Sequence, residues 1–162
     1  SRRISSFARM PSVNLYLGDL NNVILTQLSL FKISNSNIKW HYVNKLTNDF
    51  KMKIDSQKIR QALTNIFQNS IDSINENSSI SEGKIDILTE FKNKNVLLII
   101  EDNGIGFPKN RDNLTNPYVT LRKKGTGLGL SIVQRIVEEH NGKLTLSDSN
   151  LGGAKIIIEF LI

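Results

Sequence analysis

The stretch Val96–Pro108, VLLIIEDNGIGFP, decides how this chain folds. It opens with five apolar residues in a row, which is typical of a strand buried in the centre of a sheet. Asp102 ends the strand and is followed by Gly104 and Gly106. Asp-Asn-Gly by itself most often marks a tight turn. A carboxylate at the end of a strand could instead accept a hydrogen bond from the exocyclic amine of adenine, while the glycines let the backbone close over the ring.

Segments before and after this strand in the sequence alternate between apolar and polar side chains, as strands do. Residues 84–92 are expected to pair with 95–102 across a turn at Asn93 and Lys94. Further strands are predicted at 37–46, 50–55, 143–148 and 154–161, the last two joined by a turn at 151–153.

Three segments have the spacing of apolar residues expected of helices that pack by one face. Asp19 is the expected N-cap of the first helix. Asp55 is that of the longest, whose apolar residues from Ile59 to Ile74 form one continuous stripe. The third helix is predicted over 127–140. Single helices between runs of strands, with antiparallel hairpins, predict an α/β fold: a two-layer α/β sandwich with a mixed, mostly antiparallel sheet packed on helices.

The composition limits the classes of protein to consider. The chain has 162 residues and a net charge of +6, but its cations are scattered, so no nucleic-acid partner is expected. It contains no cysteine, which excludes disulfides and thiolate metal sites and suits a reducing cytoplasm. No apolar run approaches the roughly 20 residues that cross a bilayer, and no signal peptide is recognisable. We therefore expect one soluble, cytoplasmic domain.

A second glycine-rich stretch, RKKGTGLGLS at Arg122–Ser131, opens the third helix. Its G-x-G-x-G spacing matches neither a P-loop nor a dinucleotide-binding turn. Glycines at the start of a helix let unpaired N–H groups approach an anion, and the helix dipole favours negative charge there. The stretch predicts a phosphate site, with a flexible surface turn beside a solvated charge run as the alternative.

Asparagines on the longest helix are a third unusual feature. Asn65, Asn69 and Asp72 are spaced i, i+4 and i+7, so they share one strip beside the apolar stripe. Amide oxygens suit Mg²⁺, which keeps several waters while it bridges phosphates. Asparagine is a poor helix former, so two of them one turn apart are less easily explained as solvated helix residues. After the central strand, Asn103–Lys124 lacks periodicity, as long loops that are functional or disordered do.

Taken in order, these motifs resemble the ATP-binding domain of sensor histidine kinases, which shares the Bergerat (GHKL) fold with type II topoisomerases, Hsp90 and MutL. QALTNIFQNSIDSI is similar to the N box of that family, EDNGIGFP to its G1 box and GTGLGLSIV to its G2 box. NPYVTLRKK resembles the F box and lid, with Tyr118 where many members carry phenylalanine. SSFARMP, PYVT and GTGLGL are most similar to the NtrY/NtrB-type nitrogen-regulation branch.

The resemblance assigns residues 19–162 to the ATP-binding catalytic domain and 1–18 to the end of a dimerisation helix and a linker. It implies that Asn69 coordinates Mg²⁺, that Asn65 lies beside the phosphates and that Asp102 binds the adenine amine. The nucleotide-binding residues that it implies are Asn65, Asn69, Asp72, Asp102, Gly104, Gly106, Tyr118, Thr120, Arg122, Lys123, Lys124, Gly125, Thr126, Gly127, Leu128 and Gly129. Of these, Asn65, Asn69 and Lys124 would be catalytic, and Asn69 would be the metal ligand.

The phosphoacceptor of this family is missing from the chain. Sensor kinases phosphorylate a histidine, followed by an acidic residue, on a helical hairpin before this domain. His41 lies on the polar face of a predicted strand. His140 lies in the last turn of a helix, where the dipole favours a cation. Both histidines are therefore interpreted as structural, and the chain as a catalytic fragment.

A second departure separates kinases from the Bergerat ATPases. Those enzymes place a glutamate one helical turn before the metal asparagine, where it activates water. Here that position is Asn65, and an amide cannot act as a general base. Phosphoryl transfer chiefly needs positioning and charge neutralisation. A kinase that hydrolyses ATP slowly is therefore favoured over an ATPase.

The resemblance implies an ATP:protein-histidine phosphotransferase of two-component signalling that uses ATP and magnesium. Its expected partners are the dimerisation hairpin of the parent kinase and a response regulator. The fragment is expected to be monomeric and the parent homodimeric, with or without an anchor in the inner membrane. The alternative is an anti-sigma-type serine kinase or a nucleotide-dependent binding module of the same fold. Intact glycine boxes disfavour a non-catalytic nucleotide sensor, and the absence of a basic stripe disfavours a nucleic-acid-binding domain.

Overall fold

The computed structural model describes residues 13–109, 114 and 129–162. The elements in this part of the chain are, in order, β1 (Tyr16–Gly18), α2 (Leu20–Ser34), β2 (Ile38–Asn44), β3 (Met52–Ile54), α3 (Ser56–Glu76), β4 (Gly83–Lys92), β5 (Asn95–Asp102), α4 (Gly129–Glu139), β6 (Gly142–Asp148) and β7 (Ala154–Phe160).

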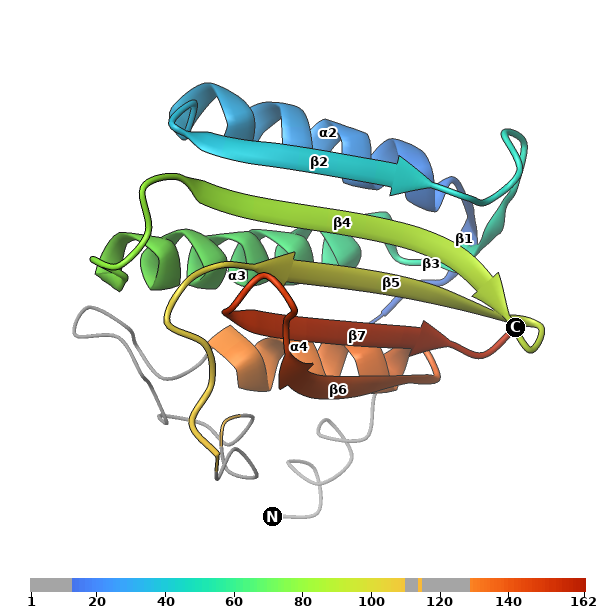
Figure 1. Ribbon diagram of the computed structural model, residues 1–162. Helices are drawn as coiled ribbons and strands as arrows, with labels where there is room; N and C mark the ends of the chain where they lie inside the picture. The colour runs from blue at the N-terminus through green and yellow to red at the C-terminus, as the bar shows by residue number, and fades with distance from the viewer. Residues whose placement is uncertain (1–12, 110–113, 115–128) are drawn as a thin grey trace, which may run out of the picture.

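Five strands form the main sheet in the order β2-β4-β5-β7-β6. β2 runs parallel to β4, and all other neighbours in this sheet are antiparallel. Figure 1 shows α2, α3 and α4 together on one face of the sheet. The prediction of a two-layer α/β sandwich with a mixed, mostly antiparallel sheet is confirmed.

The strand β5 is the central one, as its apolar run predicts. Val96, Leu98 and Ile100 are each 2% exposed or less and belong to one core cluster with the stripe of α3. Ile66 and Phe67 of that stripe are fully buried. Burial of side chains of this size stabilises the fold by about 1.5–3 kcal/mol each. The packing of α3 on β5 therefore fixes the positions of residues at the ends of these two elements.

A second, two-stranded sheet was only half predicted. The strand expected at 50–55 is β3, and it pairs antiparallel with β1. Nothing in the sequence pattern indicated β1, because Tyr16 and Leu17 are both exposed and so show no alternation. The pairing holds residues 16–18 against β3. The boundary between a linker at 1–18 and the catalytic domain at 19–162 stays a prediction.

Both predicted helix caps are confirmed. The Asp19 carboxylate accepts from the N–H of Asn22 at 3.1 Å, and the Asp55 carboxylate accepts from the N–H of Lys58 at 3.2 Å. Asp55 also accepts from the N–H of Asn14 at 2.9 Å. Burial raises the pKa of Asp55, but the N–H groups of Asn14 and Lys58 and the positive charge of Lys58 outweigh burial, so its pKa is lowered.

The predicted turn between β4 and β5 is confirmed in its position and has an uncommon conformation. Asn93 and Lys94 have φ of 52° and 67°. Two-residue hairpin turns of this kind need φ > 0 at both central residues because that twist matches the flanking strands. Asparagine adopts this conformation readily, whereas lysine is strained in it.

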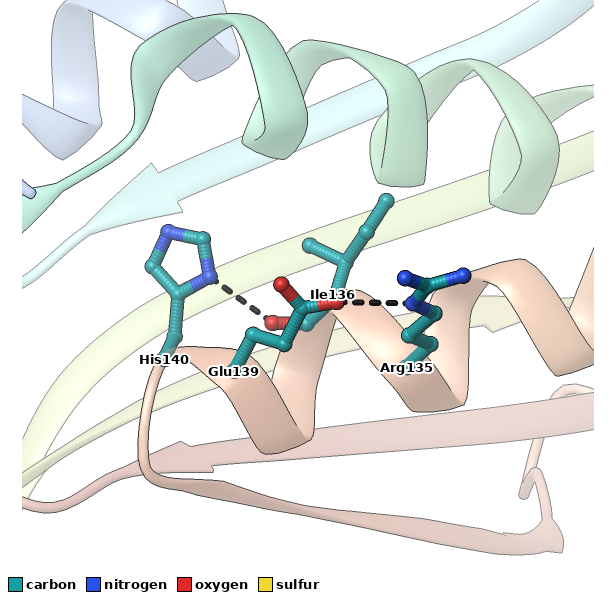
Figure 2. A network of polar contacts seen from close by, with 4 residues as sticks. All are labelled: Arg135, Ile136, Glu139 and His140. Atoms are coloured by element: carbon teal, nitrogen blue, oxygen red, sulfur yellow. Dashed lines mark hydrogen bonds and ion pairs between the residues drawn. The ribbon is translucent and has the colours of Figure 1, made fainter. Parts of the chain in front are cut away.

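His140 follows the last residue of α4, and both its ring nitrogens are engaged in hydrogen bonds. Its Nδ1 lies 2.8 Å from the carbonyl oxygen of Ile136, and its Nε2 accepts from the N–H of Asp55 at 3.0 Å. A carbonyl can only accept and an N–H can only donate, so in this arrangement Nδ1 donates and Nε2 accepts. Figure 2 shows the His140 side chain at the end of α4, with the Arg135–Glu139 ion pair along the same helix. The residue is 6% exposed and structural, as interpreted from the sequence.

Candidate functional site

The asparagine strip of α3 faces the start of α4. Asn65, Asn69 and Asp72 are all half-buried beside the apolar stripe, as their spacing predicts. The Asn65 side-chain amide donates to the carbonyl oxygen of Gly129, the first residue of α4, at 3.5 Å. A Cβ on Gly129 would lie 3.5 Å from Nδ2 of Asn69. Two amide side chains therefore flank the N-terminus of a helix of 11 residues.

The chemistry of this end of α4 suits an anion. The first N–H groups of a helix have no partner within it, and the helix dipole places partial positive charge there. Asparagine amides can donate to a phosphate or ligate a cation that bridges phosphates. Asn65, Asn69 and Gly129 are thus brought together as the sequence predicted for a phosphate site.

Asp102 is held at the end of β5 by the start of β7. Its Oδ1 accepts from the N–H of Gly104 at 2.9 Å and from the N–H of Ala154 at 3.1 Å. The Asp102 carbonyl oxygen also accepts from the N–H of Gly153 at 3.1 Å. The residue is 3% exposed. The tight turn and the oriented carboxylate, which were alternatives in the sequence, are therefore both present.

Ser73 belongs to this corner and was not predicted. Its Oγ accepts from the N–H of Ile105 at 2.9 Å, and a Cβ on Gly104 would lie 2.2 Å from that Oγ and 2.6 Å from the Ser73 carbonyl carbon. Only glycine fits at 104. Ser73 lies one turn after Asn69, so the spacing 65, 69, 73 was the signal that could have found it.

Two further asparagines fix the loop that follows β5. Asn103 accepts from the N–H of Lys84 at 2.7 Å and donates to the Glu82 carbonyl oxygen at 2.8 Å. Asn77, which caps the end of α3, donates to the carbonyl oxygens of Asn103 and Gly104 at 3.0 and 3.1 Å. The Asp102–Gly104 turn is thereby attached to the end of α3 by Asn77 and to the start of β4 by Asn103.

The two parts of the site lie along one face of α3. Ser73 is two turns beyond Asn65, which separates them by about 12 Å along the axis. Gly106 has φ of +78°, a left-handed conformation that glycine adopts without strain. The arrangement places the buried Asp102 carboxylate at one end of this face and anion-binding groups at the other.

A metal at this site would have few protein ligands. Within the described ranges 13–109, 114 and 129–162, no cluster of three or more His, Cys, Asp or Glu side chains could hold one. An amide oxygen of Asn69 together with phosphate oxygens and water is a donor set that fits Mg²⁺, which prefers oxygen and keeps several waters. The residues present therefore fit a magnesium ion that enters with a polyphosphate.

The remaining predicted site residues cannot be placed. Tyr118, Thr120, Arg122, Lys123, Lys124, Gly125, Thr126, Gly127 and Leu128 lie outside the described residues, and their roles stay predictions.

Comparison with known proteins agrees with this geometry. The chain matches the family model of histidine kinase-, DNA gyrase B- and HSP90-like ATPases over residues 54–162. An NtrY-like sensor histidine kinase of Rickettsia prowazekii (strain Madrid E) is 35% identical over 155 residues, covering 95% of this chain and 25% of that protein. The nitrogen regulation protein NtrY of Azorhizobium caulinodans is 34% identical over 151 residues, covering 91% of this chain and 19% of that protein. The chain thus spans about a quarter or less of the length of these relatives.

Solved structures give the same result. The nucleotide-free catalytic domain of histidine kinase ThkA matches with a TM-score of 0.80 and 27% identity, covering 92% of this chain and 96% of that one. ThkA in complex with the response regulator protein TrrA matches with a TM-score of 0.76 and 26% identity, covering 98% of this chain and 45% of that one. The chain belongs to the family of histidine kinase-, DNA gyrase B- and HSP90-like ATPases.

Proposed function

We propose that this chain is the ATP-binding catalytic domain of a two-component sensor histidine kinase. It transfers the γ-phosphate of ATP to a histidine on a dimerisation hairpin that lies elsewhere in the parent protein. One observation carries the proposal: Asn65 and Asn69 flank the first residue of α4, while Ser73 on the same face of α3 lies under the turn that orients Asp102.

The binding of ATP follows from these positions. The Asp102 carboxylate accepts from the adenine amine, and Gly104 and Gly106 let the backbone approach the ring. The phosphates extend along α3 toward Gly129, where helix N–H groups face them. Asn69 would hold Mg²⁺, which would supply charge neutralisation at the phosphates. In the proposal, Lys124 and its neighbours add positive charge from the loop after β5.

Phosphoryl transfer is favoured over hydrolysis because the Asn65 side chain cannot act as a general base. An amide has no free base to take a proton from water, whereas an imidazole acceptor is itself a good nucleophile and needs none. A site that positions the γ-phosphate and neutralises its charge can therefore phosphorylate a histidine while hydrolysing ATP slowly. The missing base separates the proposed kinase from the ATPases of the same family.

The acceptor histidine is supplied by another segment or chain in this proposal. The ring of His140 is buried, and both its nitrogens are used in hydrogen bonds. His41 is exposed on β2, an edge strand of the sheet, away from α4. Neither has the helical hairpin context that the proposed reaction requires.

Partners and location follow from the same proposal. We infer a response regulator as the next phosphate acceptor, by analogy with the complex of ThkA and TrrA. The similarity to NtrY suggests nitrogen regulation. The parent is proposed to be a homodimer with its catalytic domain in the cytoplasm. Among the helices that the structure describes, none is both long and apolar enough to cross a bilayer.

The decisive experiment supplies the missing acceptor. The protein is incubated with Mg²⁺, ATP labelled on the γ-phosphate and the separately produced hairpin of its parent kinase. We expect slow, concentration-dependent label on the hairpin histidine that is lost in acid, as a phosphoramidate is. Asn69→Ala should abolish the label and weaken ATP binding at least tenfold, which corresponds to about 1.4 kcal/mol.

The matched control is Asn75→Ala. Asn75 is an exposed asparagine on the same helix, so its removal should leave both activity and binding unchanged. Acid-stable label on serine would favour the anti-sigma-type serine kinase instead. Rapid release of phosphate without any acceptor would favour an ATPase, and unchanged binding in Asn69→Ala would remove that residue from the site.

A further inference from the structure

A pocket lies at the far end of α4 from the candidate site. It has a volume of about 300 Å³. His140, which follows the last residue of α4, lines it, whereas Gly129, the first residue of α4, accepts from Asn65 at the candidate site. Leu15, Phe50 and Met52 form part of its wall. The pocket is therefore built where the segment before β1, the strand β3 and the end of α4 meet.

The wall of this pocket is largely apolar and partly open to water. Leu161 and Ile162, which follow β7, also line it and are 58% and 63% exposed. Met52 is 7% exposed. Apolar side chains exposed around a concavity gain free energy when a ligand covers them, and ligand pockets are mostly apolar with a few polar groups.

Among the side chains that line the pocket, the polar ones carry positive charge or belong to His140 and Asn141. Lys51 and Lys53 line it from β3 and the residue before it. Lys51 pairs with Asp19 only at 3.9 Å, and no ion pair engages Lys53 in the described part of the chain. The ring of His140 also lines the pocket, and both its nitrogens are already used in hydrogen bonds within the protein. The pocket therefore carries an excess of positive charge over an apolar surface.

We propose that this pocket binds a small apolar monoanion, a free carboxylate with an aliphatic or aromatic body. A water occupies about 30 Å³ in the liquid, so a pocket of this size has room for a ligand of roughly ten non-hydrogen atoms. The carboxylate lies against Lys53, where an ammonium group attracts it at the rim. The body of the ligand covers Met52, Leu161 and Ile162.

A ligand in this pocket contacts two parts of the chain that are far apart in sequence. Leu15 belongs to the segment that enters the domain, and Asn141 follows α4, whose first residue lies at the candidate site. Bound anion would hold these two parts together. Binding at this pocket does not depend on the proposed kinase activity.

The test is a titration of the ¹⁵N-labelled protein, saturated with Mg·ATP, with octanoate, 1-octanol and octylamine. Octanoate should shift the amide signals of Leu15, Met52, Asn141 and Ile162 with a saturable curve, and the alcohol and the amine should bind at least tenfold more weakly. Lys53→Glu should weaken octanoate binding at least tenfold. Lys39→Glu, the same charge change at an exposed lysine on β2, should change it less than twofold.

Three results would overturn the proposal. Octanol binding as tightly as octanoate would show a purely apolar pocket. Octylamine binding as tightly would contradict the positive rim. Absence of saturable shifts at these amides up to ~10 mM octanoate, a concentration that detects even millimolar affinity, would show that the pocket takes no such ligand.

Discussion

Gly153→Ala tests the position of the Asp102 carboxylate directly. A Cβ on Gly153 would lie 2.3 Å from Oδ1 of Asp102, and 2.6 Å from both the Asp102 carbonyl oxygen and the Gly104 nitrogen. Ordinary contacts begin at 3.4 Å, so the end of β5 or the start of β7 must shift by about 1 Å in a region too densely packed to absorb it.

The loss of stability can be estimated from the hydrogen bonds that this shift disrupts. Oδ1 of Asp102 accepts from Gly104 and Ala154, and a hydrogen bond to a charged group contributes about 1.5–3 kcal/mol. Overpacking adds about 1–3 kcal/mol. We expect the free energy of unfolding to fall by about 2–4 kcal/mol, because one bond is lost and the loop relaxes in part. ATP binding should weaken at least tenfold, since the adenine acceptor moves.

The neighbouring glycine supplies a matched control. Gly152 has φ of +108°, and a Cβ added there would meet nothing within 4 Å, so Gly152→Ala strains the backbone without touching Asp102. Strain of this kind costs about 1–2 kcal/mol. Urea unfolding gives the stability of both variants, and calorimetric titration with Mg·ATP gives their affinity. If both variants bind ATP as tightly as the unsubstituted protein does, the carboxylate is not the adenine acceptor.

Two further predictions concern stability. Lys94→Gly should raise the free energy of unfolding by about 0.5–1 kcal/mol. Glycine removes the left-handed strain at position 94, and this gain is larger than the extra entropy that glycine loses on folding. Urea unfolding measures the change, and a loss of stability would contradict the strain. Asp55 has a lowered pKa in the folded protein, so its stabilising contribution is present above the unfolded value near 3.8 and is lost as the pH falls below it. Asp55→Asn, which keeps a good N-cap, should therefore be less stable than the unsubstituted protein at pH 7 and closer to it at pH 3; an equal difference at both pH values would refute the shift.

Most of the fold could be predicted from periodicity because every element except β1 has one dominant pattern of apolar residues. The apolar run of β5 and the stripe of α3 each bury a continuous surface, and burial of that surface determines the sandwich. β1 has no such pattern, since its two large apolar residues remain exposed. Its pairing with β3 depends on backbone hydrogen bonds that side-chain patterns do not report.

The site could be predicted where its residues lie close in sequence. Asn65 and Asn69 are one turn apart, and Asp102 and Gly104 share one turn, so spacing reveals both pairs. Gly153 and Ala154 meet Asp102 only because β7 pairs with β5, although Ala154 comes 52 residues later in the chain. Contacts of that kind require the sheet order, which local patterns do not contain.

His140 shows how a local rule is overridden by a tertiary contact. The dipole at the C-terminus of α4 favours a cation by about 0.3–1 kcal/mol near the surface. The partly buried N–H of Asp55 has Nε2 of His140 as its acceptor, and leaving a fully buried N–H unsatisfied costs about 1–3 kcal/mol. A protonated ring would donate at both nitrogens and lose that bond. The tertiary hydrogen bond to Asp55, rather than the dipole, therefore determines how the ring is held. The end of the helix can be predicted from the sequence. The hydrogen bond from the Asp55 N–H to His140 cannot, because it forms only when the start of α3 packs against the end of α4.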